Sequence, residues 1–222
     1  RLSAVDEQER LKAVEWTNNT IDTARRLGAG VVVIHAGTMD FEDIRAPYFF
    51  DMLLQGKTET PAFEIERERI LKVRQENRPP HIAALEKSLK SVTDYAKKNQ
   101  IKIGLETRYY PIEMPNFDEI GYFLKMFSPD VMGYWHDVGH AQMNEKLGIT
   151  THLDFLNAYQ DRLIGVHLHG ILGKRDHMAP FHGDMDLAKL MPYFGPDIIK
   201  VVETKYATEE ELIKAVELLK QY

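Results

Sequence analysis

Length, composition and charge describe an ordinary globular chain and exclude several kinds of function. The 222 residues are 44% hydrophobic and carry a net charge of −6, with a pI near 5.9. This length allows one domain with a sizeable core, and the acidic balance argues against nucleic acid as a partner. The absence of cysteine excludes disulfides, thiolate nucleophiles and cysteine-bound zinc, and it favours a cytoplasmic location. No apolar run approaches the roughly 18 residues of a membrane span, so no membrane partner is expected.

The first elements that the pattern predicts are one helix and one strand. Apolar residues recur at helical spacing over residues 4–27, with Ser3 as the predicted N-cap and Gly28 as a C-terminal cap. The run VVVIHAG, residues 31–37, is short, β-branched and flanked by glycine. These features favour a strand over a helix.

The segment after this strand interrupts the spacing of the chain. Later strands begin near residues 101, 131, 163 and 199, about 30 to 36 apart, which is the length of one βα unit. The step from 31 to 101 is about 70, so we predict a loop insertion at about 38–78. It is either a helical excursion packed on its neighbours, or a lid or dimer contact with an apolar part formed by Tyr48, Phe49 and Phe50. A homo-oligomer is therefore left open.

The remaining strands alternate with helices, which indicates an α/β fold with a parallel sheet. We count five βα units where a closed (β/α)8 TIM barrel has eight, and we interpret residues 1–222 as a single partial TIM-barrel domain that lacks the first three strands. A five-stranded open sheet is the alternative, with an exposed edge as its liability. The helices expected in this part of the chain cover residues 81–99, 117–127, 151–161, 187–194 and 209–219.

Polar residues of metal-binding type follow the strands at the point where each one ends. Glu106, Asp137, His167 and Glu203 each stand at the end of a different strand. The carboxyl ends of parallel strands meet at one mouth, so these four side chains are predicted to form one site. Carboxylates with one imidazole suit a divalent ion such as Mn²⁺, Mg²⁺, Co²⁺ or Zn²⁺. Buried salt bridges are the alternative interpretation of the glutamates.

Other histidines near the strand ends have less certain roles in the pattern. His169 competes with His167, because alternation along a strand places both side chains on the same face. His136 points opposite to Asp137 by the same alternation, so we interpret it as a packing residue. Surface or capping roles are expected for His81, His152 and His182.

The motif series as a whole resembles that of the xylose isomerase-like TIM barrels. This superfamily includes sugar-phosphate isomerases and epimerases, ketose 3-epimerases and type IV AP endonucleases. The resemblance covers nearly the whole chain from residue 31 onward, outside the insertion. The segments that carry it are IGLETR, HDVGHAQ, GVHLHG, DHMAPFHGDMD and VVET.

The resemblance implies a metal-dependent isomerase or epimerase that acts on a small sugar or sugar phosphate. One divalent ion would be held by Glu106, Asp137, His167 and Glu203. The two glutamates would also act as catalytic acid and base around an enediolate. The substrate-binding residues that the resemblance and the neighbouring sequence indicate are His140, Arg175, His35, His177 and Arg108.

Two alternatives come from other functional classes. An AP endonuclease-like zinc phosphodiesterase would use His35, His140 and a D-x-H pair to bind further zinc ions. In this sequence Asp176 and His177 are adjacent, and Arg175 stands where the acid belongs, which favours the isomerase. The second alternative is a catalytically silent barrel that binds a sugar or a partner protein without a metal ion.

Overall fold

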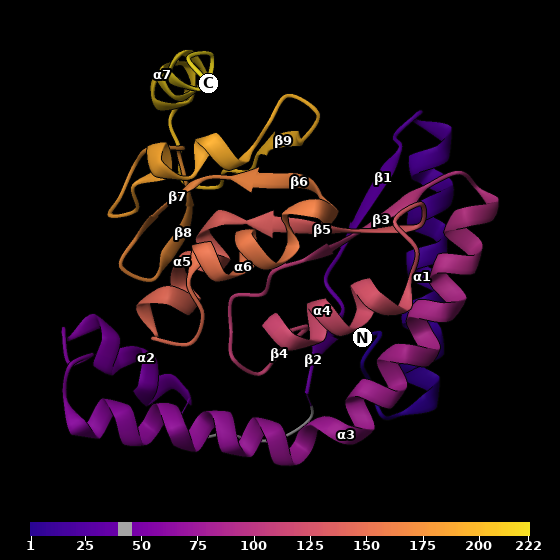
Figure 1. Ribbon diagram of the computed structural model, residues 1–222, viewed down its shortest axis with the longest axis horizontal. Coiled ribbons are helices and arrows are strands. Elements are labelled where there is room, and N and C mark those ends of the chain that lie inside the picture. Colours follow the sequence, from indigo (N-terminus) through magenta and orange to yellow (C-terminus); the bar gives the residue numbers. More distant parts are fainter. Residues whose placement is uncertain (40–45) are drawn as a thin grey trace.

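Five parallel strands form one curved sheet at the centre of the protein (Figure 1). The computed structural model describes residues 1–39 and 46–222, without the side chains of residues 46 and 47. Each strand pairs with the next one along the chain, which confirms the predicted α/β class as a parallel half-barrel. That further strands precede this sheet stays a prediction. The strands are β1 (Val31–Ile34), β3 (Lys102–Glu106), β5 (Met132–Asp137), β6 (Leu163–Leu168) and β9 (Ile199–Val202).

The first helix, α1 (Glu7–Arg26), begins later than the sequence pattern predicts. Its N-cap is Asp6, whose side chain accepts the backbone N–H of Glu9, and not Ser3. The Ser3 hydroxyl instead donates to the carbonyl of Thr38 at 3.0 Å. The predicted cap at Gly28 is confirmed, because this residue has a φ of 74° where a side chain would be strained.

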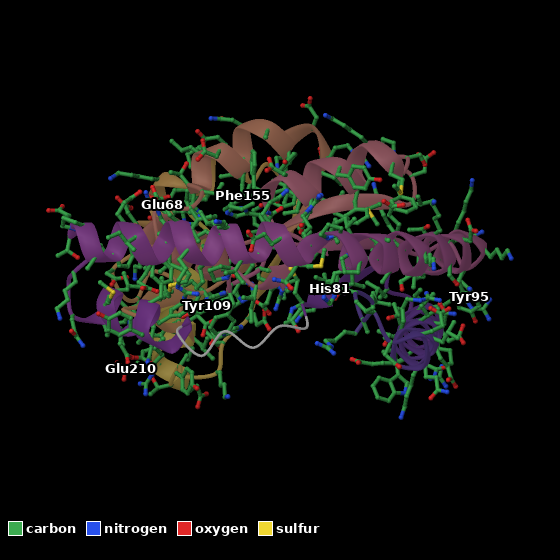
Figure 2. All side chains as sticks on the ribbon, turned by 90° about the horizontal axis from the view of Figure 1, so that it is seen from below. Glu68, His81, Tyr95, Tyr109, Phe155 and Glu210 are labelled. Carbon is green, nitrogen blue, oxygen red and sulfur yellow. The ribbon has the colours of Figure 1, made fainter. Side chains whose placement is uncertain are left out.

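The helix predicted at residues 81–99 begins twenty residues earlier, as α3 (Pro61–Lys98). Thr60 caps it, and it continues through Pro79 and Pro80. The ribbon of α3 changes direction along its length (Figure 1). A proline removes one hydrogen bond of a helix and crowds the preceding turn, which accounts for the bend. Figure 2 shows α3 extending across the molecule with His81 near its middle.

The region predicted as an insertion also contains the strand β2 (Gly37–Thr38) and the helix α2 (Ala46–Leu54). The part at residues 40–45 lies outside the described residues. Phe49 of α2 stacks on Phe63 of α3 with 4.7 Å between ring centroids, so the two helices share a buried contact. That residues 38–78 are an insertion into a single domain, and that they form a lid or dimer contact, stays a prediction.

Short elements connect the loops that follow the strands. β2 pairs antiparallel with β4 (Glu113–Met114), which ties the loop after β1 to the loop after β3. After β6, the strands β7 (Gly170–Leu172) and β8 (Arg175–Met178) form a hairpin. These connections fix loop segments at the carboxyl ends of the central strands.

The later helices follow the prediction, with two exceptions. The helix at residues 138–146 was not predicted. Instead of a helix at 187–194, the chain makes two 3₁₀ turns, Leu187–Lys189 and Met191–Tyr193, and Pro192 prevents a regular helix there. Among the described residues, no helix is both long enough and apolar enough to span a bilayer. The helices that do form are α4 (Phe117–Met126), α5 (Val138–Lys146), α6 (His152–Tyr159) and α7 (Glu209–Leu219).

Candidate metal centre and active site

Four strand-end side chains come together at one edge of the sheet. Each of Glu106, Asp137, His167 and Glu203 places one oxygen or ring nitrogen within 4.8 Å of those of the other three. The parallel register produces this, because Asp137 and His167 are direct partners of β5 and β6. Glu106 ends the neighbouring strand β3, and Glu203 follows β9. Residues up to 97 positions apart in sequence therefore share one small volume.

Three carboxylates face a single ring nitrogen of His167. Its Nδ1 lies 2.6 Å from Oε1 of Glu106, 3.0 Å from Oε2 of Glu203 and 3.5 Å from Oδ2 of Asp137. Burial alone would lower the pKa of His167, but the hydrogen bonds with Asp137 and Glu106 outweigh it and raise the pKa to about 10. The carboxylates thus favour a positive charge at His167, among the same atoms that could bind a cation.

The carboxylates of the cluster are ionised in spite of their burial. Burial would raise the pKa of Glu106, yet hydrogen bonds from His167 and His35 lower it to about 2. Burial has the same upward effect at Asp137, where His140 and His169 hold the pKa well below its usual range. Three ionised carboxylates and one imidazole form a donor set that fits a divalent ion.

Asp137 is fixed from behind by the start of α5 and by a neighbouring histidine. As the N-cap of α5 it accepts the backbone N–H of His140 at 2.8 Å through Oδ1. The same oxygen accepts from Nε2 of the fully buried His169 at 3.0 Å. His169 therefore orients Asp137, whereas His167 lies in the four-residue cluster.

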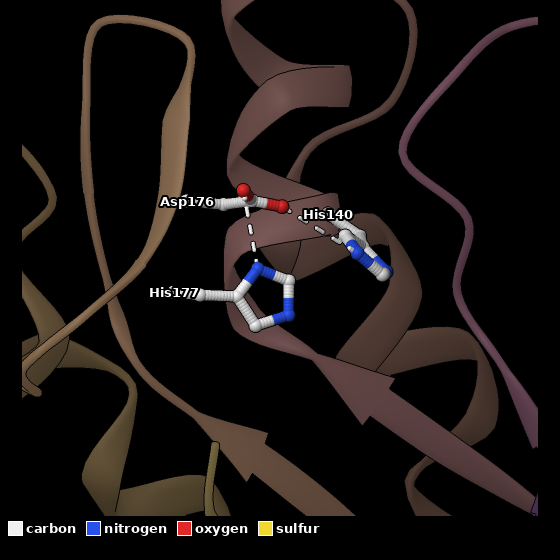
Figure 3. Close-up of side chains that lie close together, drawn as sticks. All are labelled: His140, Asp176 and His177. Carbon is white, nitrogen blue, oxygen red and sulfur yellow. Dashed lines mark ion pairs between the residues drawn. The ribbon is translucent and has the colours of Figure 1, made fainter. Parts of the chain in front are cut away.

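Figure 3 shows a second group of possible ligands, His140, Asp176 and His177. Asp176 on the β7–β8 hairpin has Oδ1 3.1 Å from Nδ1 of His177 and Oδ2 3.8 Å from Nε2 of His140. Nε2 of His177 lies 3.5 Å from Oε1 of Glu203, so the two groups touch. The carboxylates of Asp176 and Glu203 raise the pKa of His177 to about 10. Asp176 and His177 are adjacent in sequence, yet both side chains belong to this group, because His177 adopts a left-handed φ of 58°.

The other predicted substrate-binding residues are placed differently from one another. His35 reaches Oε2 of Glu106 at 2.5 Å, and its side chain is 61% exposed, so it borders the cluster on the open side. Arg108 is buried and contacts the same oxygen at 2.8 Å. Arg175 is exposed, and its guanidinium lies over the ring of Tyr206, 4.9 Å from the ring centroid.

Trp135 covers the cluster from inside the sheet. Its ring centroid lies 5.1 Å from that of His167 in an edge-on arrangement. Gly104 and Gly165 make room for the indole, since a Cβ on Gly165 would lie 2.1 Å from Cζ3 of the ring. The strands on either side of β5, β3 and β6, therefore carry glycine beside the indole of Trp135.

Sequence reasoning missed two buried histidines. His81 and His152 were expected at the surface or in caps, but they are 2% and 4% exposed. His152 bonds His136 on the outer side of the sheet, where His136 packs as predicted. His152, Phe155 and Leu156 follow the spacing of one apolar helix face, which is the signal that would have identified His152.

The family comparison agrees with the architecture. The family model described as xylose isomerase-like TIM barrel matches residues 1–222, and the chain belongs to this family. The uncharacterized protein y4fM of Sinorhizobium fredii (strain NBRC 101917 / NGR234) is 26% identical over 179 residues. That match covers 80% of this chain and 47% of y4fM, so the chain spans about half the length of this curated relative.

Solved structures share the fold at low sequence identity. A D-tagatose 3-epimerase-like protein has a TM-score of 0.63 at 21% identity, over 100% of this chain and 72% of its own. D-psicose 3-epimerase with D-tagatose, from Clostridium cellulolyticum H10, has a TM-score of 0.69 at 12% identity, over 100% and 74%. The IOLI protein with a bound zinc atom has a TM-score of 0.58 at 15% identity, over 97% and 69%.

Proposed function

We propose that this protein is a divalent-metal-dependent isomerase or epimerase of a small sugar or sugar phosphate. The observation that carries the proposal is the convergence of three carboxylates and one imidazole from four strand ends. Ligands drawn from separate strands leave an open side, as a catalytic metal site requires. The fold likeness to sugar epimerases supports the choice of substrate class.

Glu106, Asp137, His167 and Glu203 would hold one ion, for which Mn²⁺, Mg²⁺, Co²⁺ and Zn²⁺ are candidates. The bound ion would polarise the substrate carbonyl and so acidify the neighbouring C–H bond. The likeness to a zinc-containing structure makes Zn²⁺ the first ion to test.

Two glutamates carry the proton transfer in this proposal. Glu203 has a side chain that is 44% exposed, so a sugar can reach it as the base. It removes the proton from carbon, the C–H electrons form the carbon–carbon double bond, and the carbonyl π electrons move to oxygen, which gives the enediolate. Glu106 is the proposed acid on the other side: it is ionised in the free chain, so it has to take up a proton in the substrate complex before it returns that proton to carbon. His35, His140 and His177 surround the open side and are proposed to bind substrate hydroxyls.

A second candidate function is an AP endonuclease-like phosphodiesterase with two or three zinc ions. The adjoining group of His140, Asp176 and His177 favours it, because a second ion could bind beside Glu203. The net charge of −6 disfavours a DNA substrate. A silent sugar-binding barrel is the third candidate and predicts no affinity for a metal ion.

Three measurements on the purified chain test these candidates. Metal analysis after saturation and desalting is expected to give one ion per chain, whereas two or three ions support the phosphodiesterase. Proton exchange from solvent into a panel of ketoses and ketose phosphates is expected for at least one sugar, and its absence across the panel contradicts the main proposal. Nicking of a duplex with an abasic site would establish the second candidate. A cytoplasmic location and a homo-oligomer stay predictions.

A further inference from the structure

One buried arginine divides its hydrogen bonds between two carboxylates at the edge of the candidate site. Nη1 of Arg108 donates to Oε2 of Glu106 at 2.8 Å, and Nη2 donates to Oε1 of Glu113 at 2.7 Å. The arginine side chain is 8% exposed. Glu106 therefore receives only one of the two terminal nitrogens of this guanidinium.

Because Arg108 is shared between Glu106 and Glu113, it engages only one oxygen of Glu106. Oε2 is occupied by Arg108 and by His35, whereas Oε1 faces His167 and the middle of the four-residue cluster. Arginine and carboxylate pairs often adopt a two-bond arrangement in which both oxygens are engaged. In that arrangement Oε1 of Glu106 would also carry an arginine N–H, which would weaken it as a ligand toward the cluster.

Glu113 is held in place by three further sets of bonds. Its Oε2 accepts the backbone N–H groups of Tyr109 at 3.1 Å and of Tyr110 at 2.8 Å. Its backbone pairs with Thr38 in the β2–β4 ladder, and its carbonyl accepts from Arg74 of α3 at 3.2 Å. The carboxylate is therefore a fixed anchor for Arg108.

We propose that Glu113 is a positioning residue that restricts Arg108 to one oxygen of Glu106 and keeps the other oxygen free for a metal ion. This rests on the proposed function, because the ion is the one bound by Glu106, Asp137, His167 and Glu203. Without the Glu113 charge, the guanidinium turns toward Glu106 and takes both oxygens. Arg108 then competes with the ion, both by occupying Oε1 and by its positive charge.

The test measures zinc affinity of the full chain by competition with a chromogenic chelator. Glu113→Gln keeps the size of the side chain and an oxygen for the two backbone N–H groups, but it turns an NH₂ group toward Arg108. We expect zinc affinity to fall by about 10- to 100-fold, the range found when groups behind a metal ligand are changed. Glu7→Gln is the control, since Glu7 also pairs with an arginine, Arg10 of α1, there through both of its oxygens, and it is expected to leave affinity unchanged.

A second substitution separates positioning from a general structural role. In the Arg108→Met background the competing guanidinium is gone, so Glu113→Gln is expected to change zinc affinity by less than about threefold. A merely structural Glu113 would instead lower the thermal midpoint and the affinity equally in both backgrounds. If Glu113→Gln alone does not fold, Glu113→Asp, which keeps the charge but withdraws it from Arg108, takes its place in both backgrounds.

The outcomes distinguish this inference from the proposed function. Wild-type affinity in Glu113→Gln, or an equal loss in both backgrounds, overturns the positioning role and leaves the metal site standing. A wild-type chain that binds no zinc or other divalent ion overturns both.

Discussion

His136 and Asp137 are neighbours in β5, but their side chains lie on opposite faces of the sheet, in different electrostatic environments. Asp137 points to the inner side, where three carboxylates surround His167 near solvent. His136 points to the outer side, where it bonds the Tyr134 hydroxyl at 2.6 Å and His152 at 3.1 Å. The inner cluster is charged and open on one side, whereas the hydrogen-bonded side chains of Tyr134, His136 and His152 on the outer side are neutral and buried.

The histidines of the two regions show what produces this difference. Carboxylates overcome burial at His167 and raise its pKa to about 10, whereas burial without a bonded carboxylate lowers the pKa of His152 to about 4. Both groups start from the same ordinary value of 6.5. Burial alone therefore makes a neutral structural histidine, and only the carboxylates make a group suited to bind or exchange a cation.

The largest effect is expected from a substitution in the inner cluster. Glu203→Gln removes one ligand charge and the proposed base, so the rate of solvent-proton exchange into a responsive ketose is expected to fall by about 10²- to 10⁴-fold. Glu210→Gln changes an exposed glutamate of α7 and is the control. Exchange within a few-fold of the wild-type rate would remove Glu203 from the mechanism.

The next effect concerns the outer region and its response to acid. Because the folded chain keeps His152 neutral and the unfolded chain does not, stability is complete above about pH 6.5 and is lost as pH falls toward 4. The loss from this group is up to roughly 3 kcal/mol of unfolding free energy. In His152→Phe the fall between pH 7 and 4.5, measured by urea denaturation, is expected to be shallower.

The control for this comparison is His182→Gln, which changes a histidine whose side chain is 38% exposed. It is expected to keep the wild-type dependence of stability on pH. An unchanged slope in His152→Phe would contradict the assignment of the acid response to the outer region.

The smallest effect is expected from a substitution that disturbs the packing of Trp135 beneath the inner cluster. Gly165→Ala forces the indole of Trp135 away from its place beside His167, with an expected loss of about 1–3 kcal/mol in unfolding free energy. In Gly195→Ala no heavy atom lies within 4 Å of the added Cβ, so a change below about 0.5 kcal/mol is expected in the same thermal melt. Equal stability of the two variants would show that Trp135 moves without cost.

Local sequence rules predicted the five strands of the central sheet, the last helix and the cap at Gly28. The runs that end in Glu106, Asp137 and His167 became β3, β5 and β6, and residues 209–219 became α7 as expected. These elements depend on the spacing of apolar residues and on capping side chains, both of which are local in sequence. The rule fails at 187–194, where apolar residues are present but Pro192 breaks the helix.

Long-range contacts were beyond such rules. No local pattern in ETRYYPIE indicates that Arg108 is shared between Glu106 and Glu113, or that His152 bonds His136 across two elements. The sharing depends on how the loop after β3 is held by β2 and α3. The metal, acid–base and substrate-binding roles of the individual side chains stay predictions.

The sequence by itself determined which residue types end each strand, because strand length and alternation are set by neighbouring residues. It also predicted that Glu106, Asp137, His167 and Glu203 would meet. Only the tertiary structure decided how near these side chains come and which neighbours set their charges. The physical reason is that pKa values and cation binding depend on distances of a few ångströms between groups far apart in the chain. Those distances follow from the register of the parallel strands and from the loops that clamp their ends.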